Sequence, residues 1–230
     1  MDPDKAAGEG LSGTVALKIT VPDVMTPPHN AKREARILTA VEGDNIIQLI
    51  ETFQQSGGRF ILSFPFMPYD LSGLLQRNLL NDNSRRSILK DLFSGLKHIH
   101  SLGIIHRDIK PSNILLSTLH GPAYIADFGI AWSPSDPESE PANEKILDVG
   151  TTSYRPPELL FGGSAYGTEL DMWAAGCVAA QVLSLGSKPL FDAGDLGSEL
   201  ALIKSIFETL GTPDLEVWPV RSSTALHIAS

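Results

Sequence analysis

Two polar stretches in the middle of the chain, each joined to a short apolar run, constrain the fold most. The stretch "IIHRDIKPSNILL" (residues 104–116) carries Asp108 and Asn113, and "YIADFG" (residues 124–129) places Asp127 directly after an apolar run. Short apolar runs bounded by polar or turn residues are typical of buried strands. The two stretches are therefore either plain polar turns between buried strands or a site built from carboxylate and amide oxygens, which are the ligands that Mg²⁺ prefers.

The order and spacing of these residues resemble a eukaryotic protein kinase. Residues 106–108 (His-Arg-Asp) and Asn113 match its catalytic loop, and residues 127–129 (Asp-Phe-Gly) match its metal-binding turn. The resemblance implies that Asp108 accepts the proton of a substrate hydroxyl. It also implies that Asn113 and Asp127 bind Mg²⁺, so ATP and Mg²⁺ are the expected cofactors.

The same resemblance places three further charged residues near the ATP phosphates. Lys110 would contact the transferring phosphate, and a lysine at this place is typical of serine/threonine kinases. Lys18 in "VALK" matches the kinase lysine strand, and Glu34 in "KREARIL" would pair with it and aim it at the α- and β-phosphates. The alternative for Lys18 and Glu34 is two solvated surface charges, which contribute little.

Apolar residues would surround the adenine end of the nucleotide. By the resemblance, Ala16 and Leu115 would sandwich the purine, and Met67 would offer its backbone N–H to the base. Phe64 in "FPFMPYDL" would guard the pocket. The alternative for Phe64 and its neighbour Phe66 is plain packing in the core.

The apolar pattern predicts an α+β fold, in which a small strand-rich part precedes a larger helical part. The predicted strands cover residues 14–20, 46–53 and 59–66, with a turn at Gly57-Gly58. The predicted helices cover residues 30–41, 82–103 (capped by Asp82 or Asn83), 168–185 and 197–210. The polar stretch from Ser133 to Lys145 is predicted to be a mobile loop. The resemblance implies two lobes: a partial N-lobe over residues 1–67 and a C-lobe over residues 68–230.

Composition and charge exclude several classes of protein. The 230 residues carry a net charge of −9 with no basic stripe, so neither nucleic acid nor a membrane surface is an expected partner. A single cysteine, Cys177, excludes an internal disulfide framework and fits a reducing compartment. The polar N-terminus is no secretory signal, and the most apolar helical stretch, residues 172–185, is too short to span a membrane. We therefore expect an intracellular protein of the cytoplasm, the nucleus or both.

Two later stretches resemble the cyclin-dependent kinase (CMGC) group: "YRPPELLFGG" (residues 154–163) and "LGTPDLEVWP" (residues 210–219). Where that group carries its cyclin-recognition helix, this chain has "PPHNAKRE", so cyclin binding is not indicated. The loop from Ser133 to Gly150 contains no threonine, and Ile146 holds the usual phosphorylated position. An enzyme of this kind is either active without that phosphorylation or inactive. The first case resembles the monomeric CDK-activating kinases of fungi, which implies a monomer whose protein substrate is the activation loop of a cyclin-dependent kinase.

The sequence "DMWAAGC" (residues 171–177) resembles the buried kinase helix whose aspartate braces the catalytic loop. Asp171 would be that aspartate. It also lies near the start of a predicted helix, where the helix dipole favours an acidic side chain. Both explanations can hold together.

The glycine-rich start of the chain fits a nucleotide-loop pattern but not its geometry. Gly8, Gly10 and Gly13 have the right spacing, yet only four residues separate Gly13 from Lys18. In a kinase the chain runs out and back along strands between these points, which takes about ten or more residues at ~3.3 Å per residue. We therefore expect a flexible lead-in, an N-lobe without its first two strands and glycine loop, and a C-lobe truncated after the helix near residue 210. The tail from about residue 221 matches no kinase helix.

Two functions compete. The first is a serine/threonine protein kinase that transfers the γ-phosphate of ATP to a protein hydroxyl. The second is a catalytically impaired, truncated kinase fragment or a pseudokinase-like module that binds a protein partner. The intact residues Lys18, Asp108, Asn113 and Asp127 favour the first function. The incomplete ends favour the second, because Glu158 would then lack the arginine that the resemblance implies, and a buried carboxylate without a partner is costly.

Overall fold

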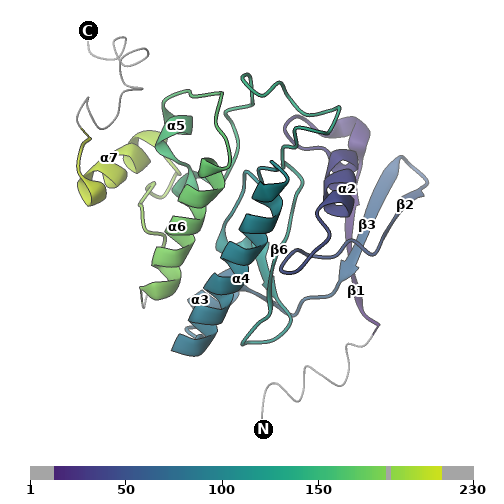
Figure 1. Cartoon of the computed structure of the whole chain (residues 1–230), viewed down its shortest axis with the longest axis horizontal. Helices are drawn as coiled ribbons and strands as arrows, with labels where there is room; N and C mark the ends of the chain where they lie inside the picture. The colour runs from purple at the N-terminus through teal and green to yellow at the C-terminus, as the bar shows by residue number, and fades with distance from the viewer. Residues whose placement is uncertain (1–12, 185–187, 214–230) are drawn as a thin grey trace.

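The computed structural model describes residues 13–184 and 188–213, and it shows a three-stranded sheet beside a larger helical part (Figure 1). The antiparallel strands β1 (Val15–Thr20), β2 (Glu51–Gln55) and β3 (Arg59–Pro65) follow the order β1-β3-β2. Gly57 and Gly58 form the predicted turn with φ of 81° and 72°, which glycine adopts without steric cost. The stretch Gly8–Gly10 and the tail from residue 221 lie outside the described residues.

The prediction of a strand over residues 46–53 is partly wrong, since β2 begins only at Glu51. Ile46 forms a single bridge with Ile125, and the Ile47 N–H donates to the Ile125 carbonyl at 2.9 Å. Both isoleucines are buried in the core. The first half of this apolar run therefore joins the three-stranded sheet to a second sheet instead of extending the first.

Helix α2 (Ala31–Ala40) agrees with the predicted helix over residues 30–41. It begins after Asn30, whose side chain accepts a hydrogen bond from the Arg33 N–H at 2.9 Å, the usual device of an N-cap. The helix buries the charged residues Arg33 and Glu34 together with its apolar face. Buried charges require partners, so the position of α2 depends on what these two side chains meet.

The rest of the chain is mostly helical, as predicted. The long helix α4 is capped by Asn81 and not by Asp82 or Asn83, and Gly103 follows its end with φ of 71°. The helices are α3 (Leu71–Gln76), α4 (Asp82–Ser101), α5 (Pro157–Leu160), α6 (Glu169–Leu183) and α7 (Glu199–Leu210). Short 3₁₀ helices are η1 (Pro22–Val24), η2 (Pro111–Asn113) and η3 (Thr152–Tyr154).

A second sheet brings the two polar stretches together. Its strands are β4 (Tyr69–Asp70), β5 (Ile114–Leu116) and β6 (Ala123–Ile125), antiparallel in the order β4-β5-β6. Ile114 pairs with Ile125, and the Ala126 N–H donates to the Asn113 carbonyl at 2.9 Å. The loop before β5 and the turn after β6 are therefore neighbours.

The polar stretch from Ser133 to Lys145 contains no helix or strand, as the loop prediction requires, and most of its residues are exposed, but its two ends are anchored. Ser133 and Lys145 are both buried. The Lys145 ammonium lies over the rings of Trp132 and Tyr166 and donates to the Tyr166 carbonyl at 2.7 Å. In Figure 1 this stretch runs along the top of the molecule and reaches α2.

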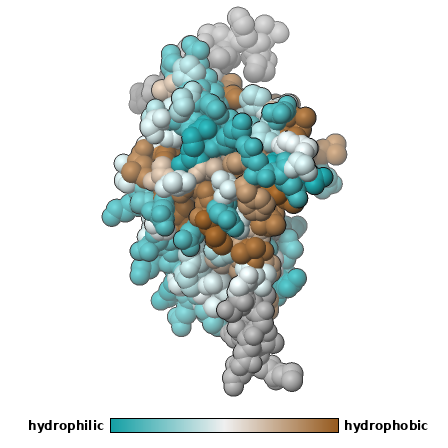
Figure 2. All heavy atoms as spheres, turned by 90° about the vertical axis from the view of Figure 1, so that its right-hand side faces the viewer, coloured by the Kyte–Doolittle hydropathy of each residue, from teal (hydrophilic) through white to brown (hydrophobic). Residues whose placement is uncertain are grey.

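Hydrophobic side chains gather on the side of the molecule shown in Figure 2, which is the side of the three-stranded sheet. Alternate residues of the edge strand β1, namely Val15, Leu17 and Ile19, are exposed. Among the described residues, no helix is long and apolar enough to cross a membrane.

Cys177 is expected to resist thiol reagents in the native protein. The side chain is 2% exposed in the core, and burial raises the pKa of the thiol to about 12. Only the thiolate is a good nucleophile, so both access and ionisation are suppressed at pH 8. We expect Ellman's reagent to titrate no thiol in the folded chain and one thiol per chain in denaturant. Rapid native labelling would contradict this placement of α6.

Candidate active site

A cleft of about 330 Å³ opens between the two sheets. Residues from both sheets and from α2 line it, including most of the residues that the sequence predicted around the nucleotide: Ala16, Lys18, Glu34, Phe64, Met67, Asn113, Leu115 and Asp127. The register explains part of this gathering. Ala16 and Lys18 are two positions apart on β1, so their side chains lie on the same face of the sheet, and Ala16 lies opposite Phe64 on β3. Asp108 and Lys110 lie beside the cleft and connect to it through Asn113.

Lys18 contacts two carboxylates at once. Its Nζ lies 2.7 Å and 2.8 Å from the two carboxylate oxygens of Glu34 and 2.6 Å from Oδ1 of Asp127. The Glu34 side chain is 1% exposed, which excludes the alternative of solvated surface charges. The ion pair expected between β1 and the following helix is therefore present.

The environment shifts the pKa of each of these three groups. Burial raises the pKa of Glu34 even though the Lys18 ammonium opposes the shift. Burial disfavours the charged forms of Lys18 and Asp127 as well. The carboxylates of Glu34 and Asp127 nevertheless raise the pKa of Lys18, and the Lys18 ammonium lowers the pKa of Asp127. The Lys18 ammonium is thus held at the cleft by two carboxylates, which favour its charged form.

The catalytic-loop residues form a compact hydrogen-bonded group. The Asn113 amide Nδ2 donates to the backbone carbonyl of Asp108 at 2.9 Å and to its Oδ2 at 3.1 Å. Lys110 Nζ lies 2.8 Å from the same Oδ2. The spacing of Asp108, Lys110 and Asn113 in the sequence therefore corresponds to direct contact in space.

Thr151 belongs to this group, and the sequence reasoning missed it. Its backbone N–H and its hydroxyl donate to Oδ1 of Asp108 at 3.1 Å and 2.8 Å, and its hydroxyl accepts from Lys110 Nζ at 2.9 Å. The available signal was the threonine directly after Gly150. Thr151 fixes the orientation of the Asp108 carboxylate from the side opposite Asn113.

Asp171 binds the backbone of the catalytic loop, as the resemblance implied. This fully buried carboxylate accepts hydrogen bonds from the backbone N–H groups of His106 at 2.8 Å and Arg107 at 2.9 Å, and it also contacts His100 Nε2 at 2.9 Å. Its place in the first turn of α6 also suits the helix dipole. Both explanations therefore apply, and the three partners set the position of the loop.

Two residues beside this group have backbone conformations that side chains rarely adopt. Arg107 has φ of 71° and Asp127 has φ of 64°. Such conformations cost on the order of 1–3 kcal/mol each and persist only where the surroundings fix them. His106 connects the backbone on either side of them. Its Nε2 donates to the carbonyl of Ala126, the residue before Asp127, at 3.0 Å, and its Nδ1 accepts from the N–H of Asp108, the residue after Arg107.

Apolar side chains line the other end of the cleft. Ala16, Phe64, Met67 and Leu115 all contribute to its wall. Phe64 also packs against the main core, whereas Phe66 is 42% exposed and also lines the cleft. Core packing thus describes part of the role of Phe64.

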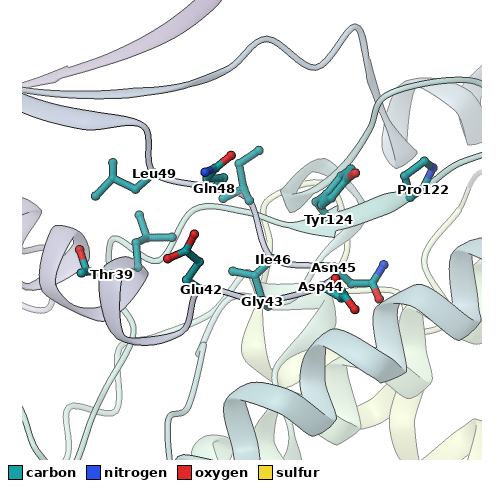
Figure 3. Close-up of a pocket in the computed structure, with 12 residues that line it drawn as sticks. Thr39, Glu42, Gly43, Asp44, Asn45, Ile46, Gln48, Leu49, Pro122 and Tyr124 are labelled. Carbon is teal, nitrogen blue, oxygen red and sulfur yellow. The ribbon is translucent and has the colours of Figure 1, made fainter.

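A larger hollow of about 670 Å³ lies outside this cleft (Figure 3). In Figure 3, Tyr124 and Pro122 lie across from the turn after α2 that carries residues 43–46. None of the charged residues predicted for the site lines this hollow. The charged groups, and not the volume, therefore distinguish the smaller cleft as the candidate active site.

Glu158 forms no ion pair within the described part of the chain. Burial raises the pKa of its carboxyl, and the nearby carboxylate of Glu169 adds to the shift. An arginine partner, which the sequence resemblance implied, would have the opposite effect.

The chain matches the protein kinase domain family over residues 6–230. It is 38% identical over 201 residues to the serine/threonine-protein kinase csk1 of Schizosaccharomyces pombe, covering 86% of this chain and 64% of csk1. It is also 38% identical over 201 residues to cyclin-dependent kinase 7 of Xenopus laevis, covering 86% of this chain and 54% of that relative.

A solved structure is similar over most of the chain. The yeast RNA Pol II CTD kinase CTDK-1 complex contains a chain that matches with a TM-score of 0.74 and 31% identity, over 90% of this chain and 64% of that one. The chain thus spans a little under two thirds of csk1 and of this structural neighbour.

Proposed function

Because this chain belongs to the protein kinase family and its relatives include cyclin-dependent kinases, we propose that it transfers the γ-phosphate of ATP to a serine or threonine hydroxyl of a protein. One observation carries the proposal: an unbroken series of contacts joins Lys18, the group proposed to bind the ATP phosphates, to Asp108, the group proposed to accept the substrate proton. Lys18 meets Asp127 at 2.6 Å, the Ala126 N–H meets the Asn113 carbonyl at 2.9 Å, and Asn113 Nδ2 meets Oδ2 of Asp108 at 3.1 Å.

On the acceptor side, Asp108 accepts the proton of the substrate hydroxyl. Lys110 Nζ lies between Asp108 and Thr151, where it can neutralise charge on the transferring phosphate. Phosphoryl transfer depends mainly on such positioning and charge neutralisation. The four donors that converge on the Asp108 carboxylate orient it for this role.

On the nucleotide side, Lys18 anchors the α- and β-phosphates and Glu34 orients it. Asn113 and Asp127 suit a magnesium ion, because the Asn113 amide nitrogen is turned to Asp108 and Lys18 occupies only Oδ1 of Asp127. Magnesium sites of this kind use one or two protein oxygens and complete their shell with phosphates and water. The bound ion would neutralise charge on the ATP phosphates. Ala16, Leu115, Phe64 and Met67 would hold the adenine.

The proposed protein substrate is the activation loop of a cyclin-dependent kinase, and the chain would act inside the cell as a monomer. The absence of threonine between Ser133 and Gly150 and the sequence "PPHNAKRE" support this narrower proposal. Similarity to the serine/threonine-protein kinase csk1 and to cyclin-dependent kinase 7 supports assignment to the cyclin-dependent kinase group. The structural neighbour was solved as a complex, so a partner subunit is the competing proposal.

Transfer of labelled phosphate from Mg²⁺-ATP tests the proposal. The acceptors are a catalytically inactive cyclin-dependent kinase, the same protein with its activation-loop threonine replaced by alanine, and a peptide of the RNA polymerase II C-terminal repeats. We expect label on the first acceptor alone and none after Mg²⁺ is removed with EDTA.

Other outcomes decide between the alternatives. Label on the polymerase peptide alone would keep the kinase and reject the proposed substrate. If no acceptor is labelled although the purified chain is folded, the impaired fragment or binding module is favoured. Turnover that appears only with an added partner subunit would reject the monomer.

A further inference from the structure

The stretch that the sequence predicted to be mobile carries three acidic residues that contact arginines far away in the sequence. We call Asp136, Glu138 and Glu140 the acidic segment. Arg36 on α2 lies 2.7 Å from Asp136 and 3.0 Å from Glu138. The Glu138 backbone carbonyl also accepts a hydrogen bond from Arg33 Nη1 at 3.1 Å, but only the Glu140 carboxylate lies within ion-pair distance of two different arginines.

Glu140 lies between Arg33 of α2 and Arg107 of the catalytic loop. Its carboxylate lies 3.0 Å from Nη1 of Arg107 and 3.8 Å from Nη1 of Arg33. The indole N–H of Trp132 donates to the Glu140 backbone carbonyl at 2.8 Å, which fixes the residue in place. The carboxylate is therefore a shared counter-ion for two guanidinium groups.

These contacts differ from surface ion pairs because both arginines are buried. The side chains of Arg33 and Arg107 are 4% and 0% exposed, and that of Glu140 is 15% exposed. Burial and the nearby Arg107 lower the pKa of Arg33, so the two cations repel one another. Removing the single shared anion would leave two buried cations close together, which is strongly unfavourable.

The two arginines adjoin the residues on which the proposed chemistry depends. Arg33 precedes Glu34, the partner of Lys18, and Arg107 precedes Asp108. Glu138 strengthens the same junction, because it accepts a hydrogen bond from Asn30, the N-cap of α2, at 2.6 Å. One carboxylate thus connects the helix of the phosphate side to the loop of the acceptor side.

We propose that Glu140 is a positioning residue that holds α2 and the catalytic loop in the active arrangement without a phosphate group on the loop. This inference rests on the proposed kinase function. It gives a physical reason why the stretch needs no threonine. Ile146, at the usual phosphorylated position, packs instead against the hydrophobic cluster that contains Trp132 and Tyr166.

The test compares Glu140→Gln, which has the same shape but no charge, with Glu144→Gln, an exposed glutamate of the same stretch. Two measurements are made on the full chain. The first is hydrogen–deuterium exchange of residues 31–40 and 104–110, and the second determines kcat and KM separately for the protein acceptor. For Glu140→Gln we expect faster exchange in both segments and about a tenfold lower kcat. Glu144→Gln should match the wild type in both measurements.

Unchanged exchange in folded Glu140→Gln would overturn the proposal. If that variant does not fold, the double variant Arg33→Met/Glu140→Gln removes one cation together with the anion and takes its place. Wild-type exchange and kcat in the double variant would also overturn the proposal. The exchange measurement needs no turnover, so it separates a failure of this inference from a failure of the kinase proposal. The kinase proposal is tested separately by Asp108→Asn, which does not alter α2.

Discussion

Asp108→Asn is expected to lower kcat for phosphate transfer by about 10²–10⁴-fold. The asparagine side chain cannot accept the proton of the substrate hydroxyl. It would also turn an amide N–H₂ towards groups that now donate to the carboxylate, namely the Thr151 N–H or the Lys110 ammonium. Single-turnover transfer of the γ-phosphate at saturating ATP measures this effect directly.

Stability should change little in the same variant. The ion pair between Asp108 and Lys110 is partly exposed, with side chains 14% and 25% accessible, and such pairs contribute roughly 0–1 kcal/mol. An unchanged thermal midpoint would show that the lost turnover is chemical. Asp44→Asn, a carboxyl in the larger hollow, is the matched control and should keep kcat within about twofold. If Asp108→Asn behaves like this control, the assigned mechanism is wrong.

The candidate site could be predicted from the sequence where its residues are close together in the chain. Asp108 and Asn113 are five positions apart and touch in the structure. Lys18 and Glu34 are 16 positions apart, on a strand and on the next helix, so their contact required the family resemblance and could not be derived from spacing. Their local sequence alone would have been equally consistent with surface charges.

The acidic segment shows where such reasoning fails. Proline, serine and glutamate between residues 133 and 145 are typical of a solvated loop, and the composition predicted one. The partners of its acidic residues lie far away in the chain: Asp136 and Arg36 are 100 positions apart. Local composition cannot reveal the buried arginines that the fold brings from α2 and from the catalytic loop, so both the role of Glu140 and the contacts of this stretch were missed.

The errors in the secondary structure have a similar cause. The run "IIQLIETF" is mostly apolar in its first half, and apolarity does not show which sheet a residue joins. Ile46 and Ile47 pair with Ile125, whereas Glu51 begins β2. At the start of α4 the sequence "NDNS" offers several capping residues in succession, and Asn81 takes the role because its side chain reaches the Ser84 N–H.

Asp171→Ala is expected to lower the free energy of unfolding by about 3–5 kcal/mol. The carboxylate is fully buried and accepts from the N–H groups of His106 and Arg107. Alanine would leave both donors without partners in the interior. The substitution also removes a hydrogen bond that holds the backbone of Arg107 at its unfavourable φ of 71°.

Glu169→Gln distinguishes this account from a helix-dipole effect. Glu169 lies in the same first turn of α6 but is exposed, so neutralising it removes a dipole-favoured charge and costs about 0.3–1 kcal/mol. Thermal and urea unfolding should therefore separate the two variants, with a fall of about 10 °C or more in the midpoint for Asp171→Ala. Equal, small shifts for the two variants would mean that Asp171 acts through the dipole alone. In that case the His106–Asp108 loop would be held by Arg107 and its buried contacts, and turnover would survive the loss of Asp171.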